Sequence, residues 1–308
     1  MSGQILYRKR LLRPARTVLS VVNHTPFVHV CQARLRYGAL MIHEEFKRLL
    51  STQYKSHPWH GVSAGALAPE VVQSYIEIVP TSAVKLEVAK ATGHLHVDRP
   101  QRFSSLCPML YGFVPQTYCG ETIAEFCMQK TGLKKVTGDG DPLDICIMTE
   151  KDFAHGDILV SARPIGGLRM VDKGQADDKI IAVMENDIAY GGIRDIKDAP
   201  PGLIERLQHY FLSYKRPPGS TSRKQVVEIR AVYGRKEAEE VIRRSMADYE
   251  ATFGTEEERL TSLRNFLVDS VIDELAARGL VDANKATATK RAPSATRARL
   301  ASPKPRGR

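Results

Sequence analysis

The sequence lacks three features that would assign it to a special class of protein. No stretch of its 308 residues approaches the ~20 apolar residues needed to cross a bilayer, which predicts that the chain has no membrane-spanning segment. Its five cysteines form no C-x-x-C pair and are odd in number, so they indicate neither a zinc site nor a disulfide framework, and a reducing compartment fits best. We find no internal repeat. The composition, 43% hydrophobic and 26% charged, is that of an ordinary globular protein.

Acidic residues are absent from both ends of the chain. Residues 1–43 contain seven lysines and arginines and no acid, and residues 283–308 contain eight and no acid. The formal charge of +10 would by itself suggest an anionic partner such as nucleic acid. Without these two segments, the region 44–282 has 30 basic and 35 acidic residues. The centre of the chain is therefore acidic, and we expect no nucleic-acid partner.

The two basic ends receive different interpretations. Residues 1–43 are rich in arginine and interspersed with Leu, Val and Ser, as in transit peptides, so we predict delivery to the mitochondrion or another organelle matrix. The alternative is a basic tail ahead of a start at Met41, with a cytoplasmic protein. Residues 283–308 have too few apolar residues to fold and are expected to form a disordered tail.

Short runs rich in Val and Ile, separated by turn residues, fill the middle of the chain and predict a compact antiparallel barrel or sandwich of the α+β class. These runs are Ser74–Val79, Val84–Val88, His94–Val97, Leu110–Val114, Leu143–Met148, Asp157–Arg163, Lys179–Met184 and Val226–Val232. Gly166 and Gly167 lie between two runs and predict a turn or kink there.

Helices are expected late in the chain. One follows Pro200-Pro201 and ends near Lys215, and another covers Lys236–Tyr249. Thr255 and Glu258 form a capping box for a third helix, whose apolar stripe extends to Leu280 and serves either as a core flank or as a partner surface.

Three carboxylates cluster in the block Asp139-Gly140-Asp141-Pro142-Leu143-Asp144 at the entry to an apolar strand. Clustered carboxylates repel one another unless a cation lies among them, and their oxygens suit Mg²⁺ or Mn²⁺. A polar turn is the simpler alternative. A calcium EF-hand is excluded because Asp144 occupies the position that needs glycine and a strand follows the loop.

A second acidic group, Asp172 with Asp177 and Asp178, accompanies Lys179 between two further strand runs. Acids at the ends of two strands, with a lysine among them, predict a pocket for several divalent ions and an anion together. His94 and His96 are two residues apart, but without a third ligand nearby they are interpreted as surface histidines.

Taken in order, these blocks resemble soluble family I inorganic pyrophosphatases over roughly residues 73–253. The resemblance rests on Lys85-Leu86-Glu87, Val97-Asp98-Arg99, Pro108 with Tyr111-Gly112-Phe113, Asp139 to Asp144, Asp172 with Asp177 and Lys179, and Tyr214-Lys215. It implies a five-stranded OB-like β-barrel flanked by helices. The corresponding domains are a transit-like segment at 1–43, an inorganic pyrophosphatase domain at 44–253, an additional helix at 254–282 and a basic tail at 283–308.

The activity that the resemblance implies is hydrolysis of inorganic pyrophosphate to two orthophosphates, with several Mg²⁺ ions per site and with Mn²⁺ or Zn²⁺ as substitutes. Asp141 corresponds to the general base that takes a proton from the attacking water. The metal ligands would be Asp139, Asp144, Asp172, Asp177, Glu77 and Glu87. The phosphates would bind to Lys85, Arg99, Tyr111, Lys179, Tyr214 and Lys215. Family members are commonly oligomers, so a homo-oligomer is expected.

One position departs from the family pattern: Cys107 occurs where many members have a tyrosine, which predicts the loss of one supporting hydrogen bond. Two other functions stay open on the sequence alone. One is a nucleic-acid-binding OB-type barrel assisted by the basic tails, and the other is a catalytically silent homologue that acts as a scaffold.

Overall fold

The computed structural model describes residues 48, 52, 54–101, 105–215 and 227–278, without the side chains of residues 272, 273, 275 and 276. The expected transit-like segment and basic tail lie outside these residues. The chain divides into two compact units, residues 1–54 and 55–308, and the second contains every helix and strand named below.

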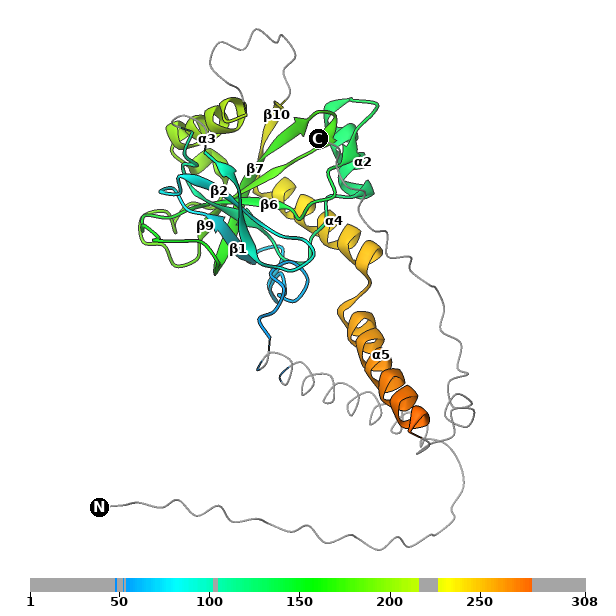
Figure 1. The fold of residues 1–308 in the computed structure, drawn as a ribbon. Helices are drawn as coiled ribbons and strands as arrows, with labels where there is room; N and C mark the ends of the chain where they lie inside the picture. Colours follow the sequence, from blue (N-terminus) through cyan, green and yellow to red (C-terminus); the bar gives the residue numbers. More distant parts are fainter. Residues whose placement is uncertain (1–47, 49–51, 53, 102–104, 216–226, 279–308) are drawn as a thin grey trace, which may run out of the picture. The chain divides into compact units, whose positions relative to one another are not determined.

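Five strands close into a barrel (Figure 1). They are β1 (Val72–Ile78), β4 (Leu110–Phe113), β6 (Asp144–Met148), β9 (Lys179–Met184) and β7 (Ile158–Asp172), paired in that order, and β7 pairs with β1 to complete the ring. The pairings are antiparallel except that β6 and β9 run parallel. The predicted five-stranded barrel is confirmed. The sequence predicted antiparallel strands throughout, whereas β6 and β9 are parallel.

The remaining strands extend this sheet or stand beside it. The strand β10 (Val227–Gly234) pairs with β7, while β8 (Gln175–Ala176) joins β7 to β5 (Thr137–Gly138). The strands β2 (Val84–Val88) and β3 (Leu95–Pro100) form a separate hairpin. This hairpin carries several of the predicted site residues.

Helices cover the barrel on different sides (Figure 1). One core cluster joins barrel residues such as Ile145 to α2 (Glu121–Thr131) and α4 (Arg235–Phe253). The other joins the alternate residues, such as Cys146, to α3 (Pro201–Ser213), which follows the short 3₁₀ helix η1 (Ile196–Asp198). Because both faces of β6 and β9 are buried, these strands appear in the sequence as continuous apolar runs.

Gly166 and Gly167 do not form the predicted turn. Strand β7 continues through them for 15 residues, and neither glycine has a positive φ. A Cβ on Gly166 would come within 2.4 Å of the Tyr233 carbonyl oxygen, and one on Gly167 within 2.4 Å of the Tyr233 hydroxyl. These glycines are therefore required by the close approach of β10, a long-range contact. The predicted turn is absent, and what the structure has instead is an irregularity in the β7–β9 register between Pro164 and Gly166.

Other expectations differ in smaller ways. Helix α2, whose buried residues include Ile123 and Phe126, is not among the predicted helices. Helix α3 begins at Pro201, as the Pro200-Pro201 pair indicated, and the third late helix is α5 (Glu256–Ala277). The capping box is confirmed, since the Glu258 amide donates to Thr255 Oγ1 (3.3 Å) and the Thr255 amide donates to the Glu258 carboxylate (2.8 Å).

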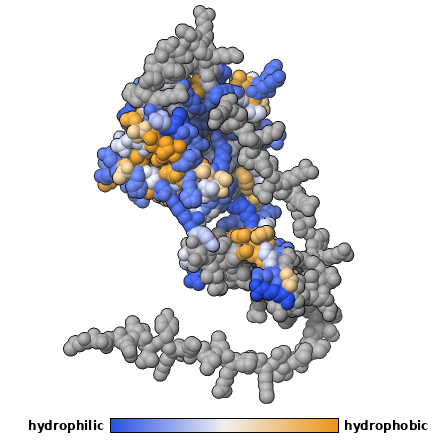
Figure 2. Space-filling view, in the orientation of Figure 1, coloured by the Kyte–Doolittle hydropathy of each residue, from blue (hydrophilic) through white to orange (hydrophobic). Residues whose placement is uncertain are grey.

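Helix α5 exposes apolar side chains to a degree unusual for a core element (Figure 2). Leu263, Phe266, Leu267 and Val271 are 38%, 68%, 41% and 55% exposed. Of the two roles expected for this helix, burial against the core does not hold for these residues. Within the described part of the chain, no helix is both long and apolar enough to cross a membrane.

Candidate active site

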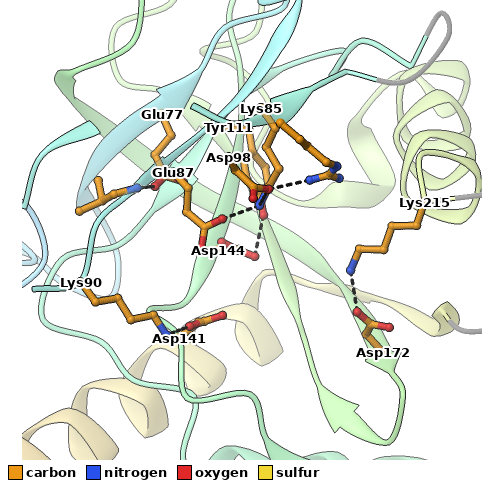
Figure 3. A network of polar contacts seen from close by, with 12 residues as sticks. Glu77, Lys85, Glu87, Lys90, Asp98, Tyr111, Asp141, Asp144, Asp172 and Lys215 are labelled. Atoms are coloured by element: carbon orange, nitrogen blue, oxygen red, sulfur yellow. Dashed lines mark hydrogen bonds and ion pairs between the residues drawn. The ribbon is translucent and has the colours of Figure 1, made fainter. Parts of the chain in front are cut away.

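All thirteen predicted site residues line one cleft of about 400 Å³ at the mouth of the barrel. Figure 3 shows part of this cleft, including Glu87, Asp141 and Asp172. The cleft is strongly charged, with eight acidic and six basic residues in its lining. The predicted residues are Glu77, Lys85, Glu87, Arg99, Tyr111, Asp139, Asp141, Asp144, Asp172, Asp177, Lys179, Tyr214 and Lys215. Tertiary structure thus brings together residues that are up to 138 positions apart in the sequence.

The acidic block forms a tight loop between β5 and β6. Gly140 has φ +74°, a conformation that favours glycine, and the amide of Asp141 donates to Asp139 Oδ1 (3.0 Å). The backbone amide of Cys119 donates to the Asp141 carbonyl (2.9 Å). The loop is therefore stabilised by a hydrogen bond to one of its own side chains and by another from the segment that precedes α2.

The parallel pairing of β6 with β9 places Asp144 directly beside Lys179. Lys179 is 2% exposed and pairs with both Asp144 and Asp177. Burial opposes its charge, but the two carboxylates hold the pKa of Lys179 well above its ordinary value. Tyr111 donates its hydroxyl to Asp144 (2.7 Å), and burial, with Asp144 nearby, raises the pKa of that hydroxyl well above the usual range.

Burial disfavours the charged form of several carboxyl groups in the cleft and so raises their pKa values. Burial and the neighbouring Asp177 and Asp141 raise the pKa of Asp139 to about 8. Burial also raises the pKa of Asp177 to about 6 and that of Glu77 to about 8. Glu77 is further held by the Val88 amide, which donates to its Oε1 (2.8 Å). Neutral buried carboxyls become anionic readily when a cation is supplied.

The donors in this cleft fit divalent cations. The Oδ1 atom of Asp172 is buried without a hydrogen-bond partner, while Oδ2 accepts from Lys215 (2.6 Å). Carboxylate oxygens are the ligands that Mg²⁺ and Mn²⁺ prefer. Among the described residues, no three His, Cys, Asp or Glu side chains converge closely enough to enclose a metal as they stand. Lysine ammonium groups, such as that of Lys179, lie between the carboxylates instead.

Four of the six phosphate-binding candidates come from the β2–β3 hairpin and from the residues that directly follow α3. Lys85 donates to Glu87 (2.7 Å) and Asp98 (3.1 Å), and Arg99 donates to Asp98 (2.8 Å). The Arg99 guanidinium also lies 5.8 Å from the centre of the Tyr214 ring. Hairpin and helix thereby present cations on two sides of the cleft.

Sequence reasoning assigned no site role to eight residues of the lining, among them Trp59, Lys90, Asp98 and Lys173. Asp98 stands in the Val97-Asp98-Arg99 block, so that block was the available signal, although no role was assigned to the acid. Lys90 lies only five residues after Lys85 but follows a turn, and nothing local indicates that its side chain returns to the cleft. Trp59 precedes residues 73–253, the region over which the sequence resembles the family.

Cys107 lies in the apolar core rather than at the cleft. It is 1% exposed, and burial raises the pKa of its thiol to about 12. Its side chain belongs to the apolar cluster beneath α3. The substitution therefore removes no residue from the cleft lining. His94 and His96 are both exposed, in line with the surface interpretation.

Comparison with known proteins agrees with this geometry. A family model described as inorganic pyrophosphatase matches residues 74–250. An inorganic pyrophosphatase of Chlamydia muridarum is 50% identical over 195 residues, which cover 63% of this chain and 93% of the relative. A soluble inorganic pyrophosphatase of Oryza sativa subsp. indica is 36% identical over 182 residues, 59% of this chain and 76% of the relative.

Solved structures give the same result. The crystal structure of inorganic pyrophosphatase from Thermus thermophilus matches with a TM-score of 0.52 and 30% identity, over 64% of this chain and 99% of that chain. A type I inorganic pyrophosphatase from Toxoplasma gondii shares the fold, with a TM-score of 0.55 at 21% identity. The family model matches more than half of this chain, and the cleft contains the residues that the family resemblance predicted. The chain therefore belongs to the inorganic pyrophosphatase family, whose members hydrolyse pyrophosphate to phosphate.

Proposed function

We propose that this chain hydrolyses inorganic pyrophosphate to two orthophosphates with Mg²⁺ and with Asp141 as the general base. The observation that carries the proposal is the convergence in one cleft of six candidate metal ligands, six candidate phosphate ligands and Asp141. A net acidic cleft binds a polyanion only if cations accompany it. Metal and substrate are therefore expected to bind together.

Asp139, Asp144 and Asp177 are proposed to hold the tightest ion, with Asp172 and Asp177 serving an ion that arrives with substrate. Glu77 and Glu87 would complete the acidic surroundings. When bound, the ions neutralise phosphoryl oxygens and lower the pKa of a coordinated water. Several Mg²⁺ ions per site are proposed, with Mn²⁺ or Zn²⁺ as substitutes.

Asp141 is proposed to orient the attacking water and to accept its proton. Its carboxylate lines the cleft, and its backbone is fixed through both the amide and the carbonyl. A base that is already oriented needs little reorganisation during the reaction.

The six proposed phosphate ligands would contact phosphate through different kinds of interaction. Arg99 can hold a phosphate through two parallel hydrogen bonds, while Lys85 and Lys215 act as point charges on it. Tyr111 and Tyr214 offer neutral donors. Lys179, already among carboxylates, would offset the charge that develops on the transferred group.

The test is phosphate release from pyrophosphate by the purified chain, with Mg²⁺ and with a chelator. Activity is expected with Mg²⁺ only. Asp141→Asn should keep the fold and lose activity by ~100-fold or more, since a general base contributes ~10²–10⁴-fold. The matched control is Asp152→Asn, at an exposed aspartate outside the cleft lining. No phosphate release by the unaltered chain would overturn the proposed function, and full activity of Asp141→Asn would overturn the assigned base.

We further propose that residues 1–43 direct the chain to the mitochondrion or another organelle matrix, on the composition described above. A fluorescent protein carrying only these residues should enter the organelle. Diffuse cytosolic fluorescence would contradict this address and favour the cytoplasmic alternative. A homo-oligomer is also proposed, supported by the exposed apolar side chains of α5.

A further inference from the structure

Lys90 is a charged residue of the cleft to which no function has been assigned so far. It lies just beyond the end of β2, and its side chain is 46% exposed. Its ammonium group forms an ion pair with Asp141 Oδ1 and also donates to the Gly140 carbonyl (3.2 Å) (Figure 3). One cation therefore contacts both the proposed base and the backbone next to it.

The position of Lys90 is set from outside the matched family segment. The carbonyl of Lys90 accepts from the His57 ring, whose Nε2 lies 3.2 Å away. The Lys90 ammonium lies 5.8 Å from the centre of the Trp59 ring. His57 and Trp59 precede residue 74, where the family model begins to match.

Trp59 is itself fixed by packing and hydrogen bonds. It is 4% exposed, its indole N–H donates to the Thr117 carbonyl (2.7 Å), and its carbonyl accepts from the Gln116 amide (2.9 Å). The hydroxyl of Thr117 in turn accepts from the Leu143 amide (2.9 Å), which lies in the acidic loop. The same short segment therefore supports both Lys90 and the loop that carries Asp141.

We propose that Lys90 is a positioning residue that holds the Asp141 carboxylate in its reactive orientation. A carboxylate on an exposed loop has several rotamers, and an ammonium bonded both to it and to the adjacent carbonyl favours one of them. An exposed ion pair contributes little to global stability. The effect of Lys90 should thus appear in turnover rather than in unfolding. This inference depends on the proposed function, because it concerns the base of that reaction.

Lys90→Met tests the inference because it removes the charge and keeps the length of the side chain. With saturating Mg²⁺, kcat should fall ~10-fold, since a small misplacement of a reacting group costs up to ~100-fold. KM for pyrophosphate should change less than twofold, roughly, because the residue does not hold substrate. Lys90→Arg should restore most of the lost kcat.

The double variant gives the sharpest result. In the Asp141→Asn background, Lys90→Met should have no further effect, because the carboxylate that it positions is already absent. Lys55→Met is the matched control, since Lys55 forms an exposed ion pair with Asp157 away from the cleft and should leave both constants unchanged.

Three results would overturn the inference while the proposed function stands. One is a Lys90→Met variant with unchanged kcat. Another is a raised KM with unchanged kcat, which would make Lys90 a substrate ligand. The third is equal losses from Lys90→Met in the wild-type and Asp141→Asn backgrounds. A thermal unfolding midpoint within about 2 °C of wild type for Lys90→Met is the expected accompanying result, and a large drop would assign the lysine a structural role instead.

Discussion

At the scale of single residues, the neighbouring acids Asp177 and Asp178 lie in different surroundings. Asp177 lines the cleft, whereas Asp178 is 3% exposed in the core, where it accepts from Arg169 (3.0 Å) and from the Tyr233 hydroxyl (3.0 Å). Successive side chains point to opposite sides of an extended backbone. Asp177 thus faces the cleft, where it pairs with Lys179, while Asp178, directly before β9, connects this end of β9 to β7 and β10.

His60 is a residue whose protonation should affect folding. Its Nδ1 lies 2.8 Å from the Tyr249 hydroxyl, and its ring stacks on Trp59 with centroids 4.4 Å apart. Burial, with smaller contributions from His57 and Arg259, lowers the pKa of His60 to about 4, below its ordinary value of 6.5.

We predict that His60 makes stability decrease as the pH falls from about 6.5 to about 4. In this window the unfolded chain binds a proton that the folded chain does not bind, so protonation favours unfolding; above it, the contribution is complete. The measurement is the urea midpoint at pH 7.5 and pH 5 for wild type and His60→Asn. Raised carboxyl pKa values act in the opposite direction, so the difference between the two proteins is the relevant quantity. An identical pH dependence in both would contradict the prediction.

At the scale of elements, strand β7 organises the molecule. Its 15 residues pair with β1, β9, β10 and β8 in turn, so it closes the barrel at one end and carries Asp172 into the cleft at the other. Its two glycines permit this continuity because β10 and η1 pack directly on them.

Gly167→Ala is predicted to destabilise the fold by about 1–3 kcal/mol, the usual effect of overpacking a core. The new Cβ would meet the Tyr233 ring and hydroxyl, and Tyr233 cannot move freely because it donates to buried Asp178. Urea denaturation gives the free energy of unfolding. Gly202→Ala, in α3, is the control, since a Cβ there meets nothing within 4 Å and alanine suits a helix. Equal stability of the two variants would show that the β10 contact can relax.

At the scale of the whole molecule, α5 stands out because several of its apolar side chains are exposed. Its first turn contains three glutamates, and Arg278 follows its last residue. Antiparallel association of two α5 helices would bury Leu263, Leu267 and Val271 and place the glutamates near Arg278 of the second copy, whereas parallel association would bring like charges together.

Leu263→Glu combined with Leu267→Glu should therefore lower the molar mass measured by size-exclusion chromatography with light scattering. Two charges placed in an apolar interface oppose association unless they are paired. Asn265→Glu, at an exposed position on the opposite side of the helix, should leave the mass unchanged. An oligomer that survives the double substitution would place its interface elsewhere, and a monomeric wild type would contradict the proposed oligomer.

Local patterns were enough to predict the acidic centre between two basic ends, most of the strands, the late helices with their capping box, and the acidic loop. These features are local, because they depend on periodicity and on residues within one turn or strand of each other. The resemblance then supplied the thirteen site residues, and their convergence in one cleft agrees with it, although their individual roles stay predictions.

Contacts between residues far apart in the sequence became known from the folded structure alone. It placed Asp144 beside Lys179 through the parallel β6–β9 register, sent Asp178 to Arg169, and brought Lys90 and Trp59 to the acidic loop. It also turned Gly166 and Gly167 from an expected turn into the interior of a strand. Each of these outcomes depends on strand register and on packing between distant segments, and neither is encoded in a local sequence pattern.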